Sequence, residues 1–216
     1  MSYKVFHKSS IENPTEFWSE QAKLIDWHKP FSEVLDYSNP PFAKWFEGGL
    51  TNLCYNAVDR HLATRGNQVA LVAVSTETDQ EKTYTYQELY TEVNRMASIL
   101  KANGVHKGDR VLIYMPMIAQ ATFAMLACAR LGAIHSVVFG GFASHSLATR
   151  IDDAEPIVIV TAEAGMRAGK TVPYKPLLDE AIELAKYKPK KVLIVNRGLT
   201  PFTSVPDRDL DYATYQ

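Results

Sequence analysis

The sequence of 216 residues has few of the features that mark disulfide-rich, membrane-spanning or nucleic-acid-binding proteins. Its two cysteines, Cys54 and Cys128, form no CxxC pair, so we interpret them as reduced, buried thiols rather than as a disulfide framework. No apolar run approaches the length of a membrane span, and the first residues contain no secretion signal. A formal net charge of −1 provides no broad positive field for a nucleic acid. These absences predict a soluble, cytoplasmic protein with neither a nucleic-acid nor a membrane partner.

A recognisable catalytic or metal-binding cluster is also missing from the sequence. Its 6 histidines show no metal-ligand spacing with cysteines or carboxylates. The run Ser144–Ser146 places a histidine between two serines, but neighbouring residues of a helix point in different directions and cannot form a triad. Asp152 and Asp153 are interpreted as solvated at a helix end. We therefore assign no catalytic residue and no metal ligand.

The residues that are present divide the chain into two parts. Residues 1–51 are rich in aromatics and interrupted by prolines, and apart from a helix expected from Pro14 to Ile25 they show no sustained periodicity. We interpret them as an irregular N-terminal extension. Residues 52–216 show regular periodicity and are expected to form the domain proper.

Alternating strand and helix patterns in the second part predict an α/β fold. After a helix at 53–64, a hairpin at 69–85 and a helix at 86–103, short Val- and Ile-rich strands alternate with helices. The strands are expected at 110–115, 135–139, 157–161 and 191–196, and the helices at 118–131, 144–151 and 176–186. Such βαβ units predict a mostly parallel, doubly wound sheet with flanking helices. Residues 198–216 are polar and expected to be irregular. Because a doubly wound domain is not expected to end on such a segment, we interpret the domain as incomplete.

Ligands of an open α/β sheet bind beyond the carboxyl ends of the strands, which selects the loops at 116–117, 140–142 and 163–175. The third loop contains Gly169-Lys170-Thr171, which matches the last residues of the phosphate-binding motif of nucleotide hydrolases. However, Ala164 occupies the position of the first required glycine, and the prolines that follow would interrupt the helix that such a loop needs. We reject that interpretation.

Two features of these loops remain open between a functional and a structural interpretation. Arg167 and Lys170 could form a compact cationic site for a phosphate, or they could be ordinary charges on a solvated, flexible loop. The paired glycines of the Phe139–Phe142 run could let an adenine lie flat on the backbone and stack on a phenylalanine, or they could only shape a tight turn.

These residues lie within a run that strongly resembles acetyl-CoA and propionyl-CoA synthetases of the adenylate-forming superfamily, GDRVLIYMPMIAQATFAMLACARLGAIHSVVFGGFASHSLATRIDDAEPIVIVTAEAGMRAGK. The run NPPFAKWFEGGLTNLCYNAVDRHL resembles the N-terminal extension of the same enzymes. The stretches FASHS, RIDDA and YKPLLDEAI are more similar to propionate ligases than to acetate ligases. The resemblance covers nearly the whole chain and implies the N-terminal portion of a large adenylating, AMP-binding domain.

The resemblance implies that a short-chain carboxylate, ATP with Mg²⁺ and coenzyme A react through an acyl adenylate. It also implies that coenzyme A is bound by Arg167, Ala168, Gly169, Lys170, Phe139, Gly140 and Gly141. Many acetate ligases have arginine where this chain has Lys170, which keeps the charge but loses the fork of donors.

The family's Ser/Thr/Gly-rich loop followed by PKG, which binds the phosphates of ATP, does not occur in these residues. We therefore expect the isolated chain to be inactive, and its half-formed cleft to expose apolar surface through which it could self-associate. The alternative is a stand-alone module that binds coenzyme A or another nucleotide without catalysis.

Overall fold

The computed structural model describes residues 2–75 and 77–215, and the chain divides into two compact units, Met1–Asn56 and Ala57–Gln216. The first unit contains the helices α1 (Tyr3–Glu12) and α2 (Pro14–Gln21) and an antiparallel hairpin of β1 (Glu33–Asn39) and β2 (Phe42–Glu47). The helix expected to start at Pro14 is present. The expectation of an otherwise irregular segment is wrong, because a further helix and a hairpin lie within it.

Aromatic packing explains why this proline-interrupted segment is ordered. The rings of Phe6 and Phe17 lie 4.7 Å apart edge to face, and those of Trp27 and Phe31 lie 5.2 Å apart in the same way. Such pairs stabilise a small unit beyond the area that they bury. Sequence periodicity does not record contacts between rings that are far apart in the chain, so the hairpin was missed.

The helix expected at 53–64 is broken into three short pieces. These are α3 (Leu53–Ala57), a 3-10 turn at Asp59–His61 and α4 (Leu62–Arg65). The interruption falls at Val58, which is fully buried and leaves the helical conformation with φ −127° and ψ −64°.

The second unit is built on a five-stranded parallel sheet, as the alternating pattern predicts, with the order β11-β10-β7-β5-β6. Its strands are β5 (Arg110–Met115), β6 (Ile134–Phe139), β7 (Val158–Ala162), β10 (Lys191–Val195) and β11 (Asp209–Asp211). The central strands β5, β7 and β10 are almost entirely buried, which explains their continuous apolar character. β11 lies in the segment expected to be irregular, and a 3-10 turn at Tyr212–Tyr215 follows it.

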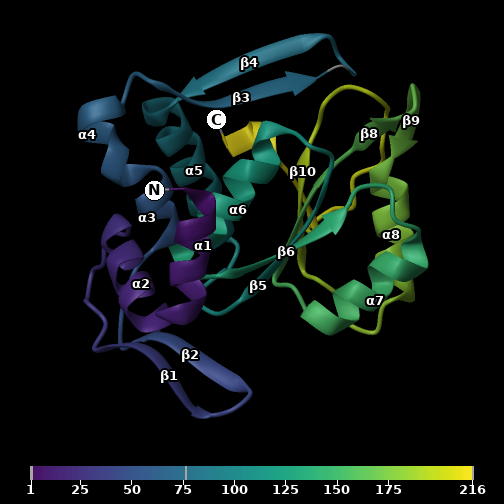
Figure 1. The fold of residues 1–216 in the computed structure, drawn as a ribbon. Coiled ribbons are helices and arrows are strands. Elements are labelled where there is room, and N and C mark those ends of the chain that lie inside the picture. The colour runs from purple at the N-terminus through teal and green to yellow at the C-terminus, as the bar shows by residue number, and fades with distance from the viewer. Residues whose placement is uncertain (1, 76, 216) are drawn as a thin grey trace. The chain divides into compact units, whose positions relative to one another are not determined.

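Helices cover both faces of this sheet (Figure 1). They are α5 (Tyr86–Ala102) and α6 (Ala119–Leu131) on one side, and α7 (Ser144–Ala154) and α8 (Tyr174–Leu184) on the other. The core beneath α7 and α8 joins Leu112 and Tyr114 of β5 to Leu147 of α7 and Leu178 of α8, all fully buried. The arrangement is the doubly wound α/β fold that the sequence predicts.

Two antiparallel hairpins complete the second unit. The first pairs β3 (Val69–Ser75) with β4 (Gln80–Thr85) and confirms the sequence prediction. It leads into α5 through a capping box, in which Glu88 donates its backbone N–H to the Thr85 hydroxyl and accepts the Thr85 N–H at 2.7 Å. The second pairs β8 (Ala164–Arg167) with β9 (Lys170–Pro173). Among the described residues, no helix is both long and apolar enough to cross a membrane.

Candidate ligand-binding site

The direction of the chain reverses at β5, and this creates a crevice at the carboxyl edge of the sheet. From β5 the chain passes through α6 to β6 on one side, and then returns through α7 to β7 on the other side of β5. The loops that follow β5, β6 and β7 therefore meet at one edge, at the switch point where α/β proteins bind ligands.

A pocket of about 320 Å³ lies at this edge. Its walls are mostly apolar, with one cationic and one acidic side chain among the described lining residues, Arg167 and Glu77. Pockets with apolar walls and a few polar groups are typical of sites for organic ligands. The lining residues are Glu77, Met115, Pro116, Met117, Val137, Val138, Phe139, Gly140, Met166, Arg167 and Tyr174.

The two phenylalanines that flank the paired glycines have different environments. Phe139, at the end of β6, is 63% exposed and lines the pocket. Phe142 is partly buried against the core, and the guanidinium carbon of Arg150 lies 4.7 Å from its ring centroid. Phe139 is therefore the ring with a free face on which a flat ligand could stack.

Each of the paired glycines is required by the protein itself. A β-carbon at Gly140 would lie 2.4 Å from the hydroxyl of Tyr174, and no real β-carbon approaches that closely. Gly141 has a φ of +89°, which side-chain-bearing residues rarely adopt, and open space surrounds its missing β-carbon. The structure thus explains Gly140 by packing and Gly141 by turn geometry.

The segment expected to be a flexible loop, 163–175, is instead a tight hairpin. Ala168 and Gly169 form the two-residue turn between β8 and β9 with φ values of 49° and 76°, and positive values at both positions are the condition of a type I′ turn. The helix α8 then begins at Tyr174, with Pro176 accepted in its first turn, where a missing N–H costs nothing. The four-residue strands were too short to be predicted from their pattern.

The hairpin brings the two predicted cations together. Arg167 and Lys170 are paired across the hairpin in register, so their side chains start from the same face, with β-carbons about 5 Å apart. Both residues are exposed. Arg167 lines the same pocket as Phe139 and Gly140, whereas Gly141, Ala168, Gly169 and Lys170 are not among its lining residues.

Two residues of the site, Tyr174 and Glu77, were missed by the sequence analysis. The Tyr174 ring packs on Tyr114 at 5.0 Å and fills the space left by Gly140 and Gly165. Burial raises the pKa of Tyr174, the Glu77 carboxylate adds to the rise, and the cations Arg197 and Arg167 oppose it. No sequence signal could reveal these roles, because they depend on contacts between residues that are far apart in the chain.

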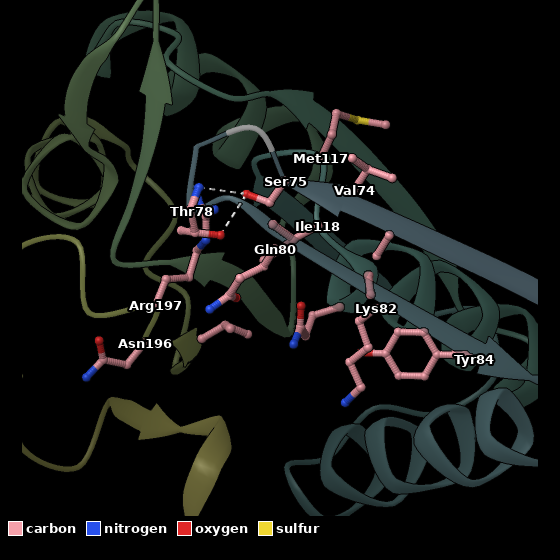
Figure 2. A pocket seen from close by; sticks show the side chains of 14 residues that line it. Val74, Ser75, Thr78, Gln80, Lys82, Tyr84, Met117, Ile118, Asn196 and Arg197 are labelled. Atoms are coloured by element: carbon pink, nitrogen blue, oxygen red, sulfur yellow. Dashed lines mark hydrogen bonds between the residues drawn. The ribbon is translucent and has the colours of Figure 1, made fainter.

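A second pocket of about 290 Å³ lies between the β3–β4 hairpin, the start of α6 and the loop after β10 (Figure 2). Figure 2 shows Gln80, Asn196 and Arg197 around its opening and the hydroxyl of Ser75 accepting two hydrogen bonds from Thr78. Met117, which is 98% exposed, lines both pockets, so they adjoin each other. Among residues 2–75 and 77–215, no group of three His, Cys, Asp or Glu side chains could hold a metal ion.

Comparisons with known proteins assign the chain to a family. A profile described as "AMP-binding enzyme" matches residues 58–213, and one described as "Acetyl-coenzyme A synthetase N-terminus" matches residues 3–57. The chain belongs to the AMP-binding enzyme family and carries the N-terminal segment found in acetyl-coenzyme A synthetases.

Individual relatives agree with this assignment. The chain is 58% identical to propionate–CoA ligase of Escherichia coli (strain K12) over 99% of its own length and 34% of the relative. It is 46% identical to acetyl-coenzyme A synthetase of Rhizobium rhizogenes over 96% of its length and 33% of that protein. The solved structure of acetoacetyl-CoA synthetase from Streptomyces lividans matches with a TM-score of 0.87 and 28% identity, covering 100% of this chain and 33% of the other. The chain therefore spans about a third of the length of these proteins.

Proposed function

We propose that the chain is the N-terminal part of an AMP-forming ligase that joins propionate to coenzyme A. The 58% identity to a propionate–CoA ligase, against 46% to an acetyl-coenzyme A synthetase, supports propionate as the acyl substrate. In the reaction that the family implies, the carboxylate attacks the α-phosphorus of ATP, in the presence of Mg²⁺, and releases pyrophosphate. The thiol of coenzyme A then displaces AMP from the acyl adenylate.

The contribution of this chain is the recognition of coenzyme A, with Arg167, Ala168, Gly169, Lys170, Phe139, Gly140 and Gly141 as its binding residues. One observation carries this assignment: Arg167 and Phe139, from the ends of the separate strands β8 and β6, line one pocket at the carboxyl edge of the sheet. An arginine fork matches a phosphate monoester, and the exposed ring of Phe139 can stack on the adenine.

The sites for ATP and Mg²⁺ belong, in this proposal, to the part of the ligase outside these 216 residues. The chain has no Ser/Thr/Gly-rich loop followed by PKG, so by itself it is expected to form no thioester. A cytoplasmic location is part of the proposal and agrees with two cysteines that are buried thiols.

The test uses a chimera in which residues 1–216 replace the matching N-terminal third of the E. coli propionate–CoA ligase. Arg167→Ala should raise the KM for coenzyme A by roughly 10- to 150-fold, since a charge-assisted hydrogen bond contributes about 1.5–3 kcal/mol. The KM for ATP should stay within about twofold, because the change removes no contact to ATP. Lys190→Ala is the control, since Lys190 is an exposed cation just before β10. It therefore lies at the amino end of that strand, whereas the pocket is at the carboxyl ends.

Binding to the 216-residue chain provides the second measurement. Calorimetry should show weaker binding of 3′-dephospho-coenzyme A than of coenzyme A, and Arg167→Ala should abolish the difference. Equal changes in the two KM values would contradict the assignment of Arg167. An unsubstituted chimera that makes no propionyl-CoA, while the chain alone binds coenzyme A, would replace the proposal with a stand-alone binding module.

A further inference from the structure

The carboxylate of Glu77 joins the β8–β9 hairpin to the loop after β10. One of its oxygens accepts the backbone N–H of Met166 at 3.2 Å, and the other accepts Nη2 of Arg197 at 2.7 Å. The Nη1 of Arg197 in turn donates to the carbonyl of Ala164 at 3.3 Å. Glu77 and Arg197 thus hold β8 at two points of its backbone, and we call these two residues the Glu77–Arg197 clamp.

The clamp acts on the residue immediately before Arg167. In a hairpin with a two-residue turn, the flanking residues Arg167 and Lys170 form the hydrogen-bonded pair, so the neighbouring Met166 directs its N–H away from the ladder. That outward N–H is the group that Glu77 accepts. The position of the Arg167 backbone therefore depends on a contact to a separate hairpin, β3–β4.

Arg197 is itself firmly placed. Its side chain is 9% exposed, and its backbone N–H donates to a carboxylate oxygen of Glu163 at 2.8 Å. The other oxygen of Glu163, which is fully buried, accepts the N–H of Leu199 at 2.9 Å. A buried carboxylate with both oxygens satisfied is a rigid anchor, so the clamp transmits a fixed position to β8.

The charge of Glu77 would otherwise oppose the binding of an anion. Glu77 lines the pocket together with Arg167, and a carboxylate repels a phosphate that enters the same space. The ion pair with Arg197 compensates that charge. A carboxylate at this position is unfavourable for the binding of a phosphate, so electrostatics alone do not explain its presence. Its hydrogen bond with the N–H of Met166 suggests a role in holding the hairpin instead.

We propose that Glu77, held by Arg197, is a positioning residue for the phosphate of coenzyme A. It fixes the base of the β8–β9 hairpin and thereby the position of Arg167 relative to Phe139, the two residues to which the proposed function assigns the phosphate and the adenine. This inference rests on the proposed function, because it assigns no new ligand and refines how the same pocket recognises coenzyme A.

The sharpest test is Glu77→Gln in the chimera, because positioning and electrostatics predict opposite signs. Glutamine has one oxygen, so it keeps one of the two contacts and presents an NH₂ group to the other donor. Positioning predicts that the KM for coenzyme A rises about 3- to 10-fold, as small displacements of a binding group do. Removal of a negative charge alone would lower that KM. Glu81→Gln, an exposed position of β4 in the same hairpin, is the matched control and should change neither KM.

A second variant, Arg197→Lys, keeps the compensating charge but cannot reach both Glu77 and Ala164. It should therefore raise the KM for coenzyme A as Glu77→Gln does, with the KM for ATP within about twofold in both. In the Arg167→Ala background, Glu77→Gln should add less than about twofold, because its effect acts through Arg167. In both single variants, the preference for coenzyme A over 3′-dephospho-coenzyme A should decrease as the KM for coenzyme A rises.

The outcomes separate this inference from the function on which it rests. A rise in KM with Arg167→Ala but none with Glu77→Gln would overturn the clamp and leave coenzyme A recognition intact. No effect of Arg167→Ala would overturn the binding assignment itself. If Glu77→Gln raised the KM for ATP and the KM for coenzyme A equally and also lowered the melting temperature, the clamp would contribute only to stability. That result would refute the positioning role.

Discussion

The hydroxyphenyl ring of Tyr174 occupies the space beside two glycines, and this makes both of them irreplaceable for reasons of packing. A β-carbon at Gly165 would lie 2.6 Å from the Tyr174 hydroxyl and 2.8 Å from Cζ, and one at Gly140 would lie 2.4 Å from the same hydroxyl. The ring therefore sets how closely the turn after β6 approaches β8. Gly140, which the resemblance implies as a coenzyme A contact, is therefore also required by the packing of one buried side chain.

A methyl group at Gly165 should therefore destabilise the protein. We expect Gly165→Ala to lower the free energy of unfolding by about 1–3 kcal/mol, the usual cost of overpacking. Tyr174→Phe removes the nearer of the two clashing atoms, so the double variant should recover part of that loss. Urea denaturation of the four proteins measures the coupling. Strict additivity of the two single changes would show that the Tyr174 hydroxyl is not the obstacle.

At the scale of elements, the β8–β9 hairpin depends on a two-residue turn in which only one of the two residues is of a type that favours the required conformation. Gly169 adopts its φ of 76° freely, whereas Ala168 has a φ of 49°, a left-handed conformation that costs an alanine about 1–2 kcal/mol. Asparagine tolerates this conformation, and Asn-Gly is the preferred type I′ pair. Ala168→Asn should thus slow hydrogen exchange at the Arg167 and Lys170 amides about 2- to 5-fold through reduced local opening. Unchanged or faster exchange would contradict the turn assignment.

Long periodic elements were predictable from the sequence, and short ones were not. The bounds of β3 and β5 were predicted to the residue, because Val- and Ile-rich runs flanked by polar residues identify strands in either kind of sheet. The strands β8, β9 and β11 have three or four residues, too few for any period to be recognised. They are formed by pairing with other strands and, for β8 and β11, by hydrogen bonds or ion pairs to residues far away in the sequence, which a local pattern does not contain.

The candidate site shows the same division between local and distant information. Phe139 could be selected because it ends a predicted strand of a parallel sheet, and Arg167 because it lies in the segment after the next predicted strand, since the carboxyl ends of such strands meet at one edge. Glu77 could not be selected, since it belongs to the separate β3–β4 hairpin and reaches Met166 across 89 positions of sequence. The ligand was inferred from the resemblance to a family, whereas only the structure identified the side chains that contact the proposed binding residues.

At the scale of the whole molecule, the sequence-based expectation of self-association stays a prediction. A strand at the edge of the sheet, β6, has three largely exposed apolar side chains, those of Ile134, Val137 and Phe139. Sedimentation velocity across a range of concentrations tests the expectation, and a sedimentation coefficient independent of concentration would contradict it.

A buried ion-pair network joins the last described strand of the second unit to α8. The ammonium of Lys175, which is 1% exposed, lies 2.6 Å from Asp179 and 2.9 Å from Asp209, and it also donates to the carbonyl of Thr203 at 3.2 Å. Arg208 pairs with both carboxylates. Burial alone would raise the pKa of Asp209, but hydrogen bonds from Arg208, the Val205 N–H and Lys175 outweigh it and hold that pKa below its usual value. The segment expected to be irregular is thereby fixed to α8.

Removing one carboxylate from this network should be costly and dependent on pH. Asp209→Asn should lower the free energy of unfolding at pH 7 by about 3 kcal/mol, the lower end for a broken buried pair, because Asp179 still faces Lys175. A carboxylate with a lowered pKa stabilises the fold fully above its unfolded pKa of about 4, and this contribution is lost as pH falls through the folded pKa. The difference between wild type and Asp209→Asn should therefore be constant from pH 7 to about 5 and shrink below about pH 4. Asp153→Asn, at an exposed position of α7, should change stability by no more than about 0.5 kcal/mol. A difference for Asp209→Asn that stays constant to pH 2 would mean that the Asp209 carboxylate does not titrate differently in the folded and unfolded states, and that its role is only one of shape.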